Sequence, residues 1–142
     1  MRRGFSLPEL AVALAVAAVV MAVTYPRVRG LLDWIAVEAA AGDVTTALAV
    51  ARNAAVTQTT RSRFVIAADT LRVDRARGDT WDAVFRWPGP LARGVSLQVS
   101  NPVIAFDPIG IGWGVSNTKV VLRRGSRIET ITVSRVGRVK RW

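Results

Sequence analysis

The stretch that decides the fold is Met1-Arg2-Arg3-Gly4-Phe5-Ser6-Leu7-Pro8-Glu9-Leu10, which continues without another charge as far as Val23. From Phe5 to Val23 it is nineteen residues long. As a helix it would extend about 28 Å, close to the ~30 Å hydrocarbon core of a bilayer. A carboxylate such as Glu9 costs roughly 2.5–3.5 kcal/mol on insertion into that core, so its presence predicts a function.

The alternative interpretation of this segment is an ordinary secretory signal, whose apolar region has a similar length. Two features argue against it. Glu9 lies between the basic end and the apolar run, and no small-x-small cleavage site followed by a polar start is present. Arg2 and Arg3 predict that the N-terminus stays cytoplasmic and that the rest of the chain crosses once.

Gly4, Phe5, Leu7 and Glu9, followed by an apolar run, resemble the class III signal of type IV pilins and type II secretion pseudopilins. The resemblance implies that a prepilin peptidase removes residues 1–4 as a leader and that the new N-terminal residue, Phe5, is methylated. It implies that Glu9 pairs with the terminal amine of a neighbouring pilin subunit during filament assembly. It also implies a single-pass protein of the bacterial inner membrane, with a periplasmic C-terminal domain, that later enters a pilus or pseudopilus.

The pattern after the apolar segment is that of an amphipathic helix. Apolar residues recur at steps of three and four and form one stripe of Val37, Ala41, Val44, Leu48, Ala51 and Ala55. We therefore predict one helix over residues 5–57, with a transmembrane half at 5–26 and an amphipathic half within 27–60. Pro26 should kink or loosen it.

Residues 61–142 show a period of two, which predicts a β-rich globular domain. The expected strands lie at residues 64–67, 71–74, 95–99, 103–106, 119–124, 127–134 and 138–142, and residues 79–94 are expected to be an irregular connection. The predicted fold class is α+β, in which the long helix packs on a small antiparallel β-sandwich.

The composition argues against an enzyme. Cysteine and histidine are both absent, which removes the thiolate nucleophile, the commonest general base and the commonest metal ligand. Gly110, Gly112 and Gly114 do not have the spacing of a phosphate-binding loop, and no Walker lysine follows them. We expect a loop with positive φ angles and a close backbone approach, and neither a cofactor nor a metal site.

The net charge of +10 favours an anionic partner, such as nucleic acid, acidic lipid or an acidic protein face. Removal of Arg2 and Arg3 would leave +8, that is 10 minus 2. The alternative source of this charge is the composition of a GC-rich genome, because arginine outnumbers lysine eighteen to two.

Three further stretches select a narrower resemblance. They are Ala51-Arg52-Asn53-Ala54-Ala55, Phe106-Asp107-Pro108-Ile109-Gly110 and Val133-Ser134-Arg135-Val136-Gly137-Arg138. Together they resemble the GspH/FimT family of minor pilins and pseudopilins, over essentially the whole chain. The resemblance implies a structural subunit of a type IV pilus or of a type II secretion pseudopilus. In the second case it would be a tip subunit that contacts other pseudopilins or secreted protein cargo.

Some FimT-like members bind DNA through a C-terminal Gly-Arg-x-Arg motif. The matching positions here are Gly137, Arg138, Val139 and Lys140, where lysine replaces the last arginine. Lysine supplies charge but not the bidentate fork of arginine.

The charge of the C-terminal tail also favours DNA binding, because residues 119–142 carry eight cations and a single acid, Glu129. An extended tail would place Arg138, Lys140 and Trp142 on one face, suited to phosphate contact and stacking. The candidate site for double-stranded DNA comprises Arg135, Gly137, Arg138, Lys140, Arg141 and Trp142. The alternative is a solvated edge strand that charge protects from aggregation, with Trp142 covering the sandwich.

Overall fold

The structure, a computed structural model, describes residues 6–142. The predicted cleavage position at Gly4 and Phe5 lies outside the described residues. The chain divides after Leu32 into two compact units.

The first unit contains the apolar part of α1 (Leu7–Thr57). Its large side chains between Leu7 and Val28 are all exposed, and this part of the helix is long and apolar enough to cross a membrane. The helix continues through Pro26 as one element, and the kink or loosening at Pro26 stays a prediction.

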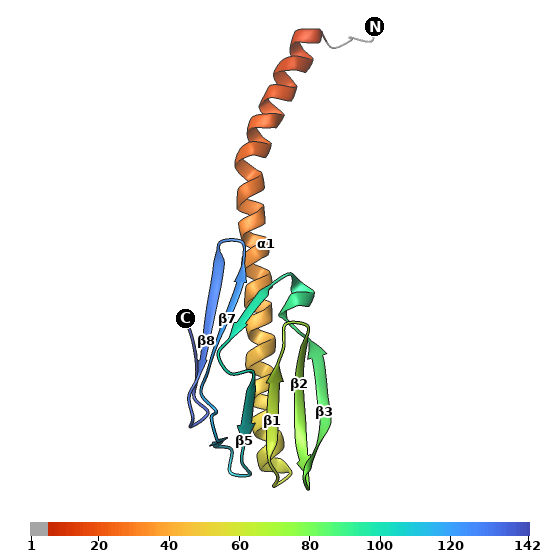
Figure 1. The fold of residues 1–142 in the computed structure, drawn as a ribbon. Coiled ribbons are helices and arrows are strands. Elements are labelled where there is room, and N and C mark those ends of the chain that lie inside the picture. The colour runs from red at the N-terminus through yellow and green to blue at the C-terminus, as the bar shows by residue number, and fades with distance from the viewer. Residues whose placement is uncertain (1–5) are drawn as a thin grey trace. The chain divides into compact units, whose positions relative to one another are not determined.

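The second unit is built on the remainder of α1, and its predicted apolar stripe is confirmed. All six stripe residues are buried, and Ala36, Ala40, Ala47 and Ala54 are buried with them. A helix face made mostly of alanine lets the strands approach its backbone closely. One apolar core joins this face to both sheets, which lie along the C-terminal half of α1 (Figure 1).

The first sheet has five antiparallel strands in the order β3-β2-β1-β5-β6. Their bounds are β1 (Ser62–Ile66), β2 (Thr70–Arg77), β3 (Thr80–Pro88), β5 (Val103–Phe106) and β6 (Gly112–Trp113). Alternate residues of the inner strands face the core, and Phe64, Leu71, Val73 and Ile104 are completely buried. The first two predicted strands are present as β1 and β2, and they pair with Phe64 opposite Val73.

The prediction that residues 79–94 form an irregular connection is wrong. They contain β3 and then a short 3-10 helix, η1 (Pro90–Arg93). The sequence did not reveal β3 because it is an edge strand whose residues are exposed or half-buried on both faces. Apolar and polar residues therefore do not alternate cleanly along it. A register shift between Val73 and Asp74 of its partner strand disturbs the period further.

The second sheet has four antiparallel strands in the order β4-β7-β8-β9. They are β4 (Ser96–Val99), β7 (Thr118–Arg124), β8 (Arg127–Val133) and β9 (Val139–Arg141), close to the predicted positions. β7 and β8 form a hairpin in which Arg124 pairs with Arg127 across Gly125, whose φ is +56°.

The glycine-rich loop has the geometry that we expected. Gly110 and Gly114 adopt φ angles of +80° and +69°. At Gly112, a Cβ atom would lie 2.6 Å from the backbone oxygen of Arg135. The glycines therefore allow the loop before β7 to pack against the segment that joins β8 to β9.

Candidate functional site

The first candidate site is the start of α1, where Glu9 belongs to a helix cap. The backbone nitrogen of Ser6 donates to Glu9 Oε2 at 3.0 Å, and the Ser6 hydroxyl donates to the same oxygen at 2.9 Å. This arrangement satisfies a backbone donor that the helix leaves without a partner. The carboxylate is exposed and held at the helix end, where it can meet a cation from another chain.

The second candidate site is the outer face of the four-stranded sheet, which we call the basic face. It is formed by Lys119, Arg123, Arg138, Lys140 and Trp142. The residues between its members on β7, Val120 and Leu122, point into the core.

The strand register brings the members of the basic face together from distant parts of the sequence. Lys119 lies opposite Thr132, and Thr132 lies opposite Lys140, so the two lysines stand in one row across three strands. Trp142 exchanges backbone hydrogen bonds with Thr130 in the neighbouring row. The predicted single face of Arg138, Lys140 and Trp142 therefore also includes two cations of β7.

Trp142 does not cover the sandwich. Its side chain is 71% exposed, and the Lys140 ammonium lies 4.9 Å from the centroid of its ring. This is a cation–π contact on the surface, and it leaves most of the indole open to a ligand.

Arg141 points to the opposite side of β9. Its guanidinium pairs with Glu38 of α1 at 2.6 Å and with Glu129 of β8 at 2.9 Å. The hydrogen bonds that Arg141 donates, first to Glu38 and then to Glu129, raise its pKa. This residue therefore fastens the last strand to the helix, and it is not part of the basic face.

Gly137 and Arg135 belong to the turn that leads into β9. Gly137 has a φ of +76° and donates its backbone N–H to the oxygen of Ser134 at 2.8 Å. Such a turn favours glycine, because other residues rarely adopt this backbone conformation. The Arg135 side chain is exposed, and its backbone oxygen accepts from Gly112.

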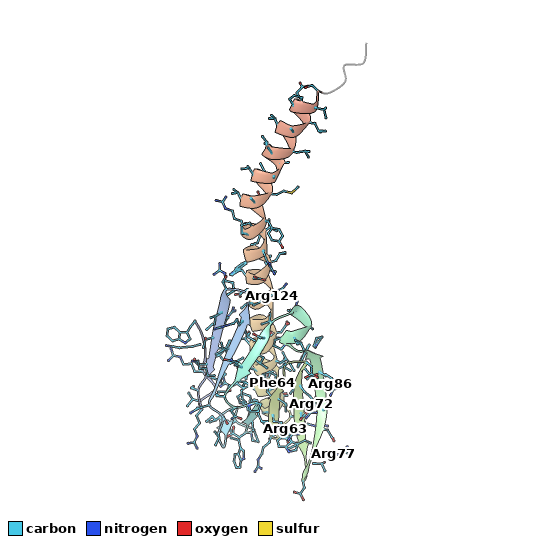
Figure 2. The ribbon with its side chains drawn as sticks, turned by 45° about the horizontal axis from the view of Figure 1, so that its top comes forward. Arg63, Phe64, Arg72, Arg77, Arg86 and Arg124 are labelled. Carbon is cyan, nitrogen blue, oxygen red and sulfur yellow. The ribbon has the colours of Figure 1, made fainter. Side chains whose placement is uncertain are left out.

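Ion pairs compensate some of the cations on each sheet. On the five-stranded sheet, Arg63 and Arg72 (Figure 2) both pair with Asp74, at 2.7 and 2.8 Å, and Asp74 is only 1% exposed. Within residues 6–142, none of the four cations of the basic face forms an ion pair. Arg75 and Arg86 of the five-stranded sheet likewise form no ion pair within those residues, so the basic face is distinguished by gathering four such cations on the face that carries the exposed Trp142.

Sequence reasoning counted Lys119 and Arg123 only as part of the tail's charge and did not assign them to the site. The available signal was their alternation with buried residues along β7, which marks them as outward-facing. Their position beside β9 follows from the strand order, which the local sequence does not reveal.

Comparison with known proteins concerns the N-terminal segment and the fold. Residues 1–25 match the family model described as the prokaryotic N-terminal methylation motif. Two crystal structures of the type IV minor pilin FimU from Pseudomonas aeruginosa PAO1 resemble the chain, with TM-scores of 0.63 and 0.61 at 14% and 13% identity. They cover 73% and 74% of this chain, and 86% and 91% of the FimU chains. No curated protein matches the sequence.

The chain thus carries a match to the N-terminal methylation motif and has a fold similar to that of the two FimU structures.

Proposed function

We propose that the protein is a minor type IV pilin of the FimT-like kind, a pilus subunit that also binds double-stranded DNA on its basic face. The observation that carries the proposal of DNA binding is the group of four cations on the basic face, which form no ion pair within residues 6–142 and share that face with the exposed indole of Trp142. The fold and the methylation motif support the role of a pilus subunit.

In this proposal the apolar part of α1 anchors the subunit in the inner membrane before assembly. Arg2 and Arg3 keep the leader in the cytoplasm, and residues 61–142 face the periplasm. Prepilin peptidase removes residues 1–4, and Phe5 becomes the methylated N-terminus. The subunit then enters the pilus, where its basic face is available to DNA.

The mature protein should begin at Phe5 and carry a methyl group on its terminal amine, because Gly4 presents no side chain to the peptidase. Mass spectrometry of the protein from pili and from membranes would measure this directly. An intact Met1 start, or cleavage near residue 25, in cells with an active prepilin peptidase would contradict the proposed processing.

DNA binding on this face should depend on phosphate contacts more than on base contacts. The cations stand on a sheet surface, and they project from alternate positions of neighbouring strands. Such an array can follow a sugar-phosphate backbone, but it presents no element that fits a groove. We therefore expect weak binding with little sequence preference.

The fragment of residues 31–142, which contains every residue of the apolar core, should bind double-stranded DNA in fluorescence anisotropy. With about three or four phosphates neutralised, log affinity should fall with log salt at a slope of roughly −3 to −4. Arg138→Ala and Lys140→Ala should each weaken binding and make the slope shallower by about one.

The matched control is Arg75→Ala, because Arg75 is on the five-stranded sheet and its side chain bonds only Gln58 among the described residues. Arg72 is a poorer control, since its removal would leave the buried Asp74 with one cation fewer. Equal losses at Arg75 and Arg138 would refute a local site. Absence of binding at low salt would favour the alternative role, a type II secretion pseudopilus tip subunit.

A further inference from the structure

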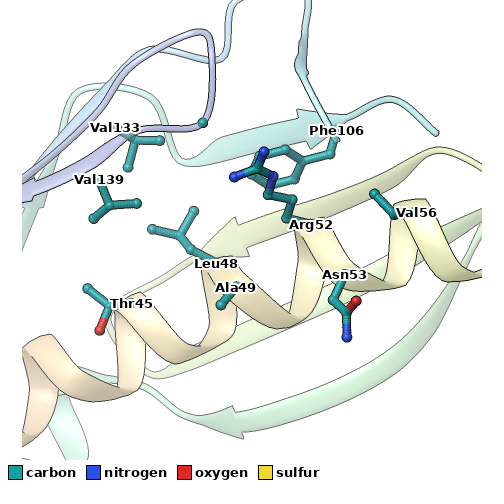
Figure 3. Close-up of a pocket in the computed structure, with 10 residues that line it drawn as sticks. Thr45, Leu48, Ala49, Arg52, Asn53, Val56, Phe106, Val133 and Val139 are labelled. Carbon is teal, nitrogen blue, oxygen red and sulfur yellow. The ribbon is translucent and has the colours of Figure 1, made fainter. Parts of the chain in front are cut away.

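A pocket separate from the basic face lies between α1, β5 and the end of β8 (Figure 3). Its volume is about 320 Å³, within the range of small-molecule sites. The walls are mainly apolar and include Leu48, Val56, Phe106, Val133 and Val139. Thr45 also lines the pocket, but its hydroxyl already donates to backbone oxygens of α1.

Arg52 is the single charged residue among those that line the pocket. Within residues 6–142 its side chain forms no hydrogen bond or ion pair, whereas six other arginines have carboxylate partners. In Figure 3 the Arg52 side chain extends from the helix towards Phe106. The pocket therefore combines an apolar wall with one unpaired, planar donor group.

Two glycines make room for this arginine. A Cβ atom at Gly110 would lie 3.1 Å from Arg52 Nε, and one at Gly137 would lie 3.6 Å from Arg52 Nη1. Both glycines also have positive φ angles. The two loops can thus close around the guanidinium without filling the space beside it.

We propose that this pocket binds a small amphipathic carboxylate, a monoanion that carries a short apolar chain. Its carboxylate would meet the fork of Arg52, and its apolar chain would lie against Val133, Val139 and Leu48. A single cation with no acid beside it selects one negative charge, and guanidinium geometry matches a carboxylate. This inference does not depend on DNA binding, because the pocket and the basic face use different side chains.

The test uses the full chain in phosphatidylcholine nanodiscs, with valine and leucine methyl groups labelled for NMR. The probe is hexanoate, and the neutral comparison is hexanamide, which has the same chain length. Hexanoate should produce saturable shifts at Val133, Val139 and Leu48. Hexanamide should bind about tenfold more weakly or worse, because it lacks the charge-assisted hydrogen bonds.

Three variants make the result specific. Arg52→Gln should reduce hexanoate affinity about tenfold and leave hexanamide unchanged, whereas Arg75→Gln should change neither. Ala49→Leu, which adds bulk to a pocket wall on an exposed helix position, should block both compounds while Arg52 stays in place. If hexanoate gives no saturable shift, or if it binds no better than hexanamide, the proposal is wrong.

Discussion

Replacing Glu9 with alanine should abolish incorporation of the protein into pili while leaving it in the membrane. An ionised carboxylate in the hydrocarbon core needs a cationic partner, and the Phe5 amine of a neighbouring subunit is the partner that we propose. Without Glu9, the bilayer segment from Phe5 to Val23 carries no charged side chain and remains well suited to insertion. Immunoblots of sheared pili and of membranes from the same cells would measure the distribution.

Two other variants separate the charge of Glu9 from its role in the helix cap. Glu9→Gln keeps an oxygen that can accept from Ser6, but it removes the charge, so it should fail to assemble as Glu9→Ala does. Ser6→Ala removes the hydroxyl donor but keeps the carboxylate and the backbone donor, and it should still assemble. Normal amounts of the Glu9→Ala protein in pili would disprove the pairing.

Replacing Phe64 with alanine should lower the free energy of unfolding of the fragment 31–142 by about 3–5 kcal/mol. Phe64 is completely buried in β1, so truncation leaves a cavity between the sheet and α1 that well-packed neighbours cannot fill. Urea denaturation followed by circular dichroism would measure the change. A loss of this size is a large fraction of the stability of a small domain.

Phe85→Ala is the matched control, because it removes the same atoms from a side chain that is 45% exposed in the edge strand β3. Phe85 stacks on Trp87 with ring centroids 5.6 Å apart. Loss of this stacking should lower the free energy of unfolding by only about 0.5–1.5 kcal/mol, in addition to the small contribution from the buried part of the ring. If the two variants lost similar amounts of unfolding free energy, Phe64 would not be a central residue of the core.

Most of the elements that sequence reasoning predicted well have one buried face. The helix stripe and the strands β5, β7 and β8 each place alternate or periodic residues in the core, so burial imposes a visible period on their sequences. The edge strand β3 has no fully buried face, and its sequence therefore carried no such period.

The candidate site was likewise predicted only in part from the sequence. Alternation along the tail was enough to place Arg138, Lys140 and Trp142 on one face. It could not show that Arg141 would pair with Glu38, because the two residues are 103 positions apart and meet only through the packing of β9 near α1. The addition of Lys119 and Arg123 likewise required the order of the strands.

The position of Arg141 gives the last strand two kinds of electrostatic contact, one on each side. Outward, Lys140 is free to meet phosphate, and inward, Arg141 holds β9 to α1 and β8 through partly exposed ion pairs. Added salt weakens both the contact of Lys140 with phosphate and the ion pairs of Arg141. A salt titration of the proposed DNA complex would therefore report ligand dissociation together with loosening of the strand that presents the ligand contacts. Arg141→Gln should lower affinity by loosening that strand, without removing a counterion-releasing contact from the DNA.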